Sequence, residues 1–341
     1  MLPFLLMLST PACKKDGPEI VTPPVVHKTF TNPVFEGADP WVYQQDSTYF
    51  FTTTLANRIE LWKTKSVTKL REVASTVAYF PSTAGTHTQN IWAPELHQLD
   101  GKWYLYYTAG SGPDSTQRTW VLENTAADPT HGAWVDKGKI YSPAYDRWAI
   151  DGTVLDHGGS RYFLWSGRPD LSVQNQNIYI AKMSNPWTLE GAVVLLSKPE
   201  LPWEVQGGPV NEGPQVLRNP QGQVLIVYSA SGCWTDDYAL GLLRLRTGGD
   251  PLQAADWTKS PQPVFVKKPQ NSAYGPGHNA FFKSRNGSED WIIYHANTKS
   301  GDGCSEKRNI RMQRFGWKSD GTPDFGEPVA VGTPISLPAG E

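Results

Sequence analysis

The stretch GADPWVYQQDSTYFFTTT at residues 37–54 sets the pattern for the whole chain. It begins with small residues and Asp39-Pro40, continues as a strand, turns at polar residues and returns as a strand rich in aromatic and β-branched residues. Two such strands joined by a short polar turn are typical of a β-hairpin. Four later stretches repeat this design, at residues 93–110, 150–167, 211–230 and 277–296.

Each repeated stretch carries one ionisable residue near its start, and these residues are regularly spaced. They are Asp39, Glu95, Asp151, Glu212 and His278, at intervals of 56, 56, 61 and 66 residues (95−39, 151−95, 212−151 and 278−212). A period of this size with about four strands per unit predicts an all-β fold, a single five-bladed β-propeller over residues 30–341. A serial β-sandwich also has many strands, but it gives no reason for a repeated ionisable residue.

Equivalent residues of successive blades lie on a ring around a propeller axis, so we expect these side chains to meet at one mouth of the channel. Carboxylates gathered so closely raise one another's pKa values, and such clusters indicate catalysis. Glycoside hydrolysis needs one carboxyl group to protonate the leaving oxygen and another to activate water or attack the sugar. Asp39, Asp151 and Glu212 offer this pair together with a third carboxylate that can orient the acid.

Four short motifs follow one another at blade spacing: GADP at 37–40, IWAPE at 91–95, AIDG at 149–152 and NEGP at 211–214. In this order they resemble the motifs of family 43 of the glycoside hydrolases, and the resemblance covers residues 30 to 335. It implies a five-bladed propeller that inverts the anomeric carbon. It also implies Asp39 as general base, Glu212 as general acid and Asp151 as the residue that modulates and positions the acid. Glu95 has the look of a scaffold carboxylate in that family.

The resemblance extends to a possible metal. Many members of the family hold a largely hydrated calcium ion in the channel, close to a histidine that matches His278 in GPGHN at 275–279. Calcium prefers oxygen ligands, so one imidazole among waters makes a weak site. We therefore expect either a calcium contact at His278 or a histidine that is only hydrogen-bonded, and no organic cofactor.

Candidate substrate contacts come from one arginine and three tryptophans. The resemblance implies an arginine in the last blade that binds sugar hydroxyls, and Arg308 is favoured over Arg311 for this role. Trp92 is the first choice for stacking on a sugar ring. Trp41 and Trp165 are further candidates, and a place in the hydrophobic core is the alternative for each tryptophan.

Three stretches indicate the class of substrate: SGCWTDDY at 231–238, GDGC at 301–304 and HNAF at 278–281. They resemble the branch of the family that removes arabinose from the ends of α-1,5-arabinan. This implies release of L-arabinofuranose from arabinan or arabinoxylan. A β-xylosidase or an endo-arabinanase on the same scaffold is the nearest alternative. A non-catalytic cell-surface glycan-binding propeller is the alternative of another class, but binding does not require a matched acid and base.

The start of the chain predicts export. Residues 1–13 form an apolar run that ends at Cys13, which we interpret as a signal with a lipid-attachment cysteine, and residues 14–29 form a tether. A signal of another kind and a chance apolar run are the alternatives. The protein is then secreted or held at the cell surface or in the periplasm, with Cys13 as its membrane link. The net charge of −2 argues against a nucleic-acid partner.

The cysteines predict a disulfide. If Cys13 carries lipid, Cys233 and Cys304 remain, and an even pair in an exported protein favours a bridge. Each cysteine follows a glycine in a polar loop, one hairpin beyond the axial residue of its blade. We therefore expect a bridge between the fourth and fifth blades near the rim of the site, with two unrelated thiols as the alternative.

Overall fold

The computed structural model describes residue 1, residues 28–143 and residues 145–341. Apart from Met1, the predicted signal segment with its Cys13 lies outside these described ranges, as does all of the predicted tether except its last two residues. Within them, no helix has the length and apolar character needed to cross a membrane.

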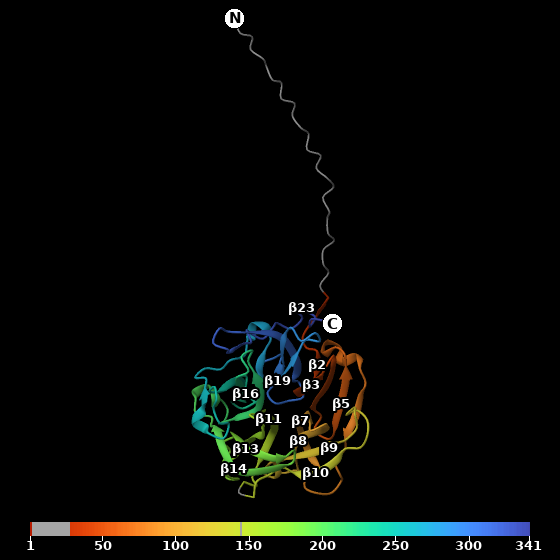
Figure 1. The fold of residues 1–341 in the computed structure, drawn as a ribbon, viewed down its shortest axis with the longest axis vertical. Coiled ribbons are helices and arrows are strands. Elements are labelled where there is room, and N and C mark those ends of the chain that lie inside the picture. The colour runs from red at the N-terminus through yellow and green to blue at the C-terminus, as the bar shows by residue number, and fades with distance from the viewer. Residues whose placement is uncertain (2–27, 144) are drawn as a thin grey trace.

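Five antiparallel sheets surround a central axis, so the prediction of an all-β, five-bladed β-propeller is confirmed. Figure 1 shows the colour passing once around the ring, because each blade follows the previous one in sequence. The first strands of the blades contact one another around the axis. Residues near the start of each blade are thereby gathered at the centre of the molecule.

Four blades are built from consecutive strands. Blade 1 contains β3 (Ala38–Gln45), β4 (Thr48–Thr54), β5 (Ile59–Thr64) and β6 (Ser75–Tyr79). Blade 2 contains β7 (Gln89–Leu99), β8 (Lys102–Gly110), β9 (Arg118–Asn124) and β10 (Val135–Lys139). Blade 3 contains β11 (Ala149–His157), β12 (Ser160–Gly167), β13 (Asn177–Asn185) and β14 (Thr188–Ser197). Blade 4 contains β15 (Asn211–Arg218), β16 (Val224–Ala230), β17 (Ala239–Leu245) and β18 (Trp257–Lys259).

The fifth blade takes a strand from the other end of the chain. It contains β19 (Tyr274–Lys283), β20 (Asp290–Asn297), β21 (Asn309–Trp317) and, beside β21, the early strand β2 (Phe35–Glu36). β22 (Pro323–Asp324) pairs with β21, and β1 (Thr29–Phe30) pairs with β23 (Ile335–Ser336) in a separate two-stranded sheet. The β2–β21 and β1–β23 pairings join the two ends of the chain by backbone hydrogen bonds, which the sequence repeat alone does not reveal.

Helical structure in the described residues is limited to short 3₁₀ turns. They are η1 (Val67–Glu72), η2 (Asp114–Thr116), η3 (Pro202–Glu204), η4 (Ala254–Asp256) and η5 (Pro269–Asn271). This agrees with the density of glycine and proline, which favours turns over helices.

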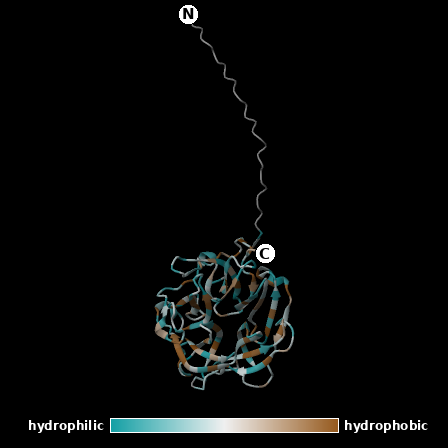
Figure 2. Cartoon of the chain, in the orientation of Figure 1, coloured by the Kyte–Doolittle hydropathy of each residue, from teal (hydrophilic) through white to brown (hydrophobic). Residues whose placement is uncertain are grey.

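The hydrophobic core consists of five clusters, each lying between two neighbouring blades. In the cluster that closes the ring, Phe51 and Trp62 of blade 1 pack with Ile293 and Met312 of blade 5. Figure 2 shows hydrophobic colours mainly on the strands of the sheets. Burial of these apolar faces fixes each blade against the next, and this positions the ring of first strands.

Candidate active site

The first strand of every blade contains a bulge at the same place. In β3, for example, Ala38 pairs with Thr54 and Trp41 with Thr52, so the register slips between them. The residue directly after the last pair before this slip has φ between 43° and 55° in every blade; these residues are Asp39, Ala93, Asp151, Gly213 and His278. Left-handed backbone is uncommon for residues other than glycine, and it is concentrated at functional sites.

This register corrects the predicted equivalence of the ionisable residues. Asp39, Asp151 and His278 do occupy matching positions, but Glu95 lies two residues beyond this position and Glu212 lies one residue before it. Glu212 pairs with Ser229 in the way that Ala38 pairs with Thr54. Sequence intervals could not reveal these offsets, because the connections between blades differ in length.

Side chains of neighbouring blades hold the bulges in place. In four blades, the N–H of the bulge residue donates a hydrogen bond to a side chain near the end of the second strand of the preceding blade. The pairs are Ala93–Thr54 (2.7 Å), Asp151–Thr108 (3.2 Å), His278–Ser229 (2.8 Å) and Asp39–His295 (3.1 Å). In the remaining blade, the N–H of Gly213 donates to Oδ2 of Asp151 at 3.0 Å. The backbone that carries the carboxylates is therefore fixed between blades.

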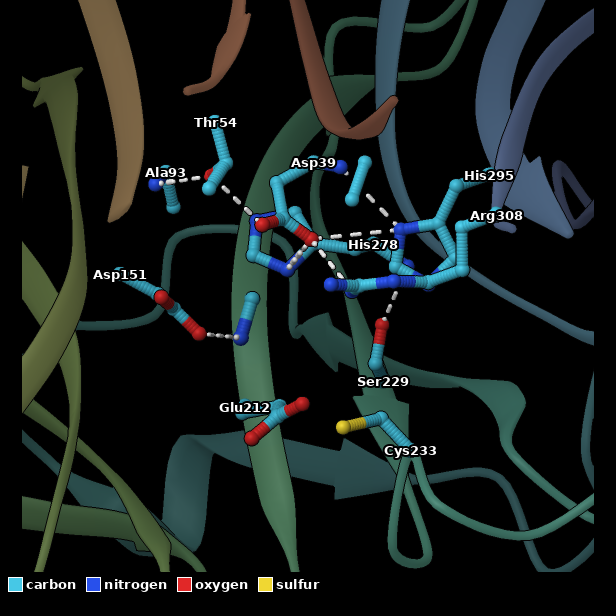
Figure 3. Close-up of polar contacts among 12 residues, drawn as sticks. Asp39, Thr54, Ala93, Asp151, Glu212, Ser229, Cys233, His278, His295 and Arg308 are labelled. Atoms are coloured by element: carbon cyan, nitrogen blue, oxygen red, sulfur yellow. Dashed lines mark hydrogen bonds and ion pairs between the residues drawn. The ribbon is translucent and has the colours of Figure 1, made fainter. Parts of the chain in front are cut away.

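Asp39 is surrounded by donors and cationic groups (Figure 3). Its Oδ2 accepts the hydroxyl of Thr54 at 2.7 Å, and its Oδ1 lies 3.4 Å from both Nη1 of Arg308 and Nδ1 of His278. Burial alone would raise the pKa of Asp39, but the charges of His278 and Arg308 hold this pKa well below its usual value. Asp39 is therefore ionised at neutral pH, as a group that takes a proton from water must be.

Asp151 and Glu212 lie in a different environment. Figure 3 shows Asp39 and Glu212 on opposite sides of the site, with Asp151 between them at one edge. Burial raises the pKa of both Asp151 and Glu212, and the negative charge of Asp39 adds to the increase. The pair Asp151–Glu212 thus retains a proton at a pH where Asp39 has lost its own. Carboxyl groups whose pKa values are pushed apart in this way suit the roles of acid and base.

Two aromatic residues that the sequence analysis did not assign connect the acid side to the base side. The hydroxyl of Tyr238 donates to Oε1 of Glu212 at 2.7 Å. The Tyr238 ring is parallel to the ring of His295, with centroids 5.7 Å apart and 6° between the planes. Burial lowers the pKa of His295 to about 4, so the neutral ring accepts the N–H of Asp39 through Nδ1. Tyr238 and His295 therefore position Glu212 and Asp39 relative to each other.

Two of the predicted substrate contacts lie at the ring of bulges. Trp92 is half-buried, precedes the bulge residue Ala93 and has the same register position as Glu212. Arg308 reaches Asp39, and its Nε and Nη2 donate to the carbonyls of Ser305 (3.3 Å) and Cys304 (3.5 Å). Arg308 therefore contacts Asp39 directly, whereas Trp92 lies at the ring by its backbone position.

The other candidates lie away from these carboxylates. Nε1 of Trp41 donates to the carbonyl of Leu96 at 2.8 Å, and the Trp41 ring packs on His97 between blades 1 and 2. Trp165 is 3% exposed in the cluster between blades 2 and 3, so the structure places it in the core rather than at the site. Arg311 is fully buried and donates to Asn309 within β21. A strand rich in aromatic residues does not by itself reveal which ring reaches the surface.

Glu95 acts as a scaffold residue. Its Oε1 accepts a hydrogen bond from the amide of Gln215, and its Oε2 lies 2.9 Å from Nε2 of His97. Because Glu95 belongs to blade 2 and Gln215 to blade 4, this contact joins two blades that are not neighbours. Both of its partners are side chains rather than backbone groups.

Cys233 and Cys304 form a disulfide, so the predicted bridge is confirmed, with Cα atoms 5.4 Å apart. It joins the loop 231–238 of blade 4 to the loop 298–308 of blade 5. The first loop ends at Tyr238, which holds Glu212, and the second ends at Arg308, which contacts Asp39. The bridge therefore links the loops that position the proposed acid and base.

Replacing both cysteines with serine is expected to lower the free energy of unfolding and to weaken activity. The bridge spans 71 residues, and for such a loop the chain-entropy model gives a loss of about 4 kcal/mol. Activity should fall several-fold because the loops carrying Tyr238 and Arg308 lose their link. Denaturant unfolding and the rate of glycoside hydrolysis at 25 °C would measure both effects. An unchanged unfolding midpoint would contradict a stabilising role for the bridge.

The fold and the carboxylate geometry agree with comparisons to known proteins. The family described as Glycosyl hydrolases family 43 matches residues 30–323. An extracellular exo-α-(1→5)-L-arabinofuranosidase of Streptomyces avermitilis is 41% identical over 97% of this chain and 69% of its own length. A protein of the same description from Streptomyces chartreusis is 37% identical over 78% of this chain and 82% of its own length.

Solved structures give the same result. The crystal structure of an α-L-arabinofuranosidase from Lactobacillus brevis superposes with a TM-score of 0.83 and 35% identity, covering 89% of this chain and 98% of that one. The family match spans most of the chain, and its ends coincide with the first and last blades. On these grounds, the chain belongs to family 43 of the glycosyl hydrolases.

Proposed function

We propose that this protein is an inverting exo-α-L-arabinofuranosidase that releases L-arabinofuranose from arabinan or another arabinose-containing polysaccharide. One observation carries the proposal: ionised Asp39 faces the proton-holding pair Asp151–Glu212 across a single site. Membership of the family supports glycoside hydrolysis, and the activity named for the relatives supports arabinofuranose as the sugar.

The geometry supports a one-step displacement. Glu212 donates its proton to the glycosidic oxygen as the bond from that oxygen to the anomeric carbon breaks. Asp39 takes a proton from a water molecule whose oxygen attacks the anomeric carbon from the opposite face, which inverts the configuration. Burial and the negative charge of Asp39 raise the pKa of Glu212, and Asp151 positions the acid by accepting the N–H of the adjacent Gly213. Arg308 and Trp92 bind the sugar, and the reaction uses no organic cofactor.

Other activities on this scaffold stay as alternatives. A β-xylosidase and an endo-arabinanase would use the same three carboxylates, because furanose and xylopyranose place similar hydroxyls in space. A non-catalytic glycan-binding propeller is a weaker alternative, since binding alone does not need one ionised and one protonated carboxyl group facing each other.

Product analysis with linear α-1,5-arabinan tests the proposal. We expect arabinose as the sole early product, and proton NMR should detect β-L-arabinofuranose before mutarotation. Oligosaccharide products would indicate an endo-arabinanase, and release from aryl xyloside but not from aryl arabinofuranoside would indicate a β-xylosidase. The α-anomer appearing first would overturn inversion. Retention of arabinan without any product would favour the binding module.

Whether a calcium ion contacts His278 depends on the groups that surround this histidine. Nδ1 of His278 faces Oδ1 of Asp39. Burial alone would lower the pKa of His278. The negative charges of Asp39, Asp151 and Glu212 outweigh this effect and raise that pKa overall. A histidine must lose its proton before it can ligate a metal, so the raised pKa of His278 opposes a direct calcium contact. Among the described residues, no cluster of three His, Cys, Asp or Glu side chains could hold a metal, and calcium takes six to eight oxygens. A calcium ion at His278 would therefore take most of its oxygen ligands from water, as the largely hydrated ion of the family does.

Export is part of the proposal. Two relatives are named as extracellular enzymes, which supports secretion of this chain. The disulfide is consistent with an oxidising compartment. A lipid anchor at Cys13 is the finer proposal, and incorporation of labelled palmitate into the wild-type chain but not into Cys13→Ala would support it.

A further inference from the structure

Trp234 is exposed in a protein that buries many of its large aromatic side chains. It lies in the loop between β16 and β17, directly after Cys233, and 54% of its surface is open to solvent. Single exposed apolar residues are common and need no explanation. The support beneath this ring and its place beside the carboxylates set it apart.

The Trp234 indole packs against the backbone of three glycines, Gly207, Gly208 and Gly232. Its Nε1 donates to the carbonyl of Gly207 at 3.2 Å. A Cβ atom added at Gly207, Gly208 or Gly232 would come within 2.8, 3.1 or 2.4 Å of indole atoms. These contacts involve both rings of the indole, so the ring system is supported along its length while more than half of the residue stays open. The side chain is therefore held in place before any ligand arrives.

Trp234 flanks the acid side of the site. Gly208 and Gly207 precede Glu212 by four and five residues (212−208 and 212−207), on the segment that leads into β15. The loop that carries Trp234 ends at Tyr238, whose hydroxyl donates to Glu212. Figure 3 places Cys233, the residue before Trp234, on the same side of the site as Glu212. A leaving group that takes its proton from Glu212 must depart past this side.

We propose that Trp234 binds the leaving part of the arabinan chain by stacking on the apolar face of the sugar next to the cleaved bond. This inference rests on the proposed acid role of Glu212 and deepens the proposed function. Ligand sites commonly combine aromatic surfaces with a few polar groups, and a preorganised side chain loses little entropy on binding. Trp234 then favours a polymeric leaving group over a small one.

The experiment compares two substrates that share the cleaved sugar but differ in the leaving group. Arabinotriose extends past Glu212, whereas methyl α-L-arabinofuranoside ends at a methyl group. Trp234→Ala should lower kcat/KM for arabinotriose about tenfold, mainly through KM, since one aromatic contact is worth roughly a factor of ten. The value for the methyl glycoside should stay within about twofold of wild type. Trp234→Phe should retain most activity on both substrates.

A matched control is Val135→Ala, because Val135 has the same exposed fraction of 54% and starts β10 in blade 2. It should change neither rate. Equal losses on the two substrates for Trp234→Ala would overturn the proposal in favour of a supporting role for the loop. An unchanged rate on arabinotriose would also overturn it. Failure of the proposed function itself differs from both, because the wild-type protein would then release no arabinose from either substrate.

Discussion

Asp39→Asn is expected to lower kcat by about 10²- to 10⁴-fold while leaving KM nearly unchanged, because a positioned general base contributes about this much. The asparagine amide cannot take the proton of the attacking water. The fold should persist, since asparagine is among the few residues that tolerate the left-handed backbone found here, at φ 54°. Its side-chain oxygen can still accept the hydroxyl of Thr54.

Steady-state kinetics on aryl arabinofuranoside and arabinotriose would measure this loss, with thermal unfolding as the check on the fold. Asp156→Asn is the matched control, since Asp156 lies in β11 with Asp151 but is exposed and paired with Arg161. That variant should keep wild-type activity. If Asp39→Asn retained more than about a tenth of wild-type kcat, a contribution far smaller than that of a general base, Asp39 would not be the base.

The repeated hairpins were enough to predict the propeller, because a period of 56–66 residues with four strands per unit has few other folded solutions. Closure of the ring was not predictable from the repeat. β2 has only two residues, and its partner β21 lies at the other end of the chain. So short a strand carries no periodic signal, and only the packing of blade 1 against blade 5 brings it into the sheet.

The candidate site was partly predictable for a similar reason. Asp39 and Asp151 share a backbone position, so the repeat identifies them, whereas Glu212 is offset by one residue and was found through its own motif. His295 and Tyr238 were missed because their roles depend on contacts between different blades. Sequence gives the order of residues along a strand, but it does not show which side chain the next blade will meet.

For the same reason, sequence does not show which tryptophans are buried and which are exposed. Trp165 and Trp92 both stand in aromatic-rich strands, yet Trp165 is enclosed by neighbouring rings while Trp92 stays half-exposed beside a bulge. Trp234 lies within SGCWTDDY, and nothing in its sequence context predicts a role for it. Its importance becomes visible only when the glycines at 207, 208 and 232 are found beneath its ring.

Glu212→Gln should remove most activity on arabinotriose, by about 10²- to 10⁴-fold, because the glutamine has no proton to give to the leaving oxygen. The loss should be smaller on an aryl arabinofuranoside, since a phenolate with a low pKa leaves without full protonation. Glutamine is nearly isosteric with glutamate and can still accept the hydroxyl of Tyr238, so the fold and the loop should persist. A base variant behaves differently, because Asp39→Asn should impair both substrates.

The pH profile gives an independent readout of the same variant. In the wild-type protein, the acidic limb of kcat/KM follows protonation of Asp39, whose pKa is held well below its usual value. The alkaline limb follows loss of the proton held by Asp151 and Glu212, whose pKa values are raised by burial. Activity therefore falls as pH rises through the pKa of the pair, and Glu212→Gln should flatten this limb for the aryl substrate. An unchanged alkaline limb, or equal losses on aryl and natural substrates, would assign the acid role to another group.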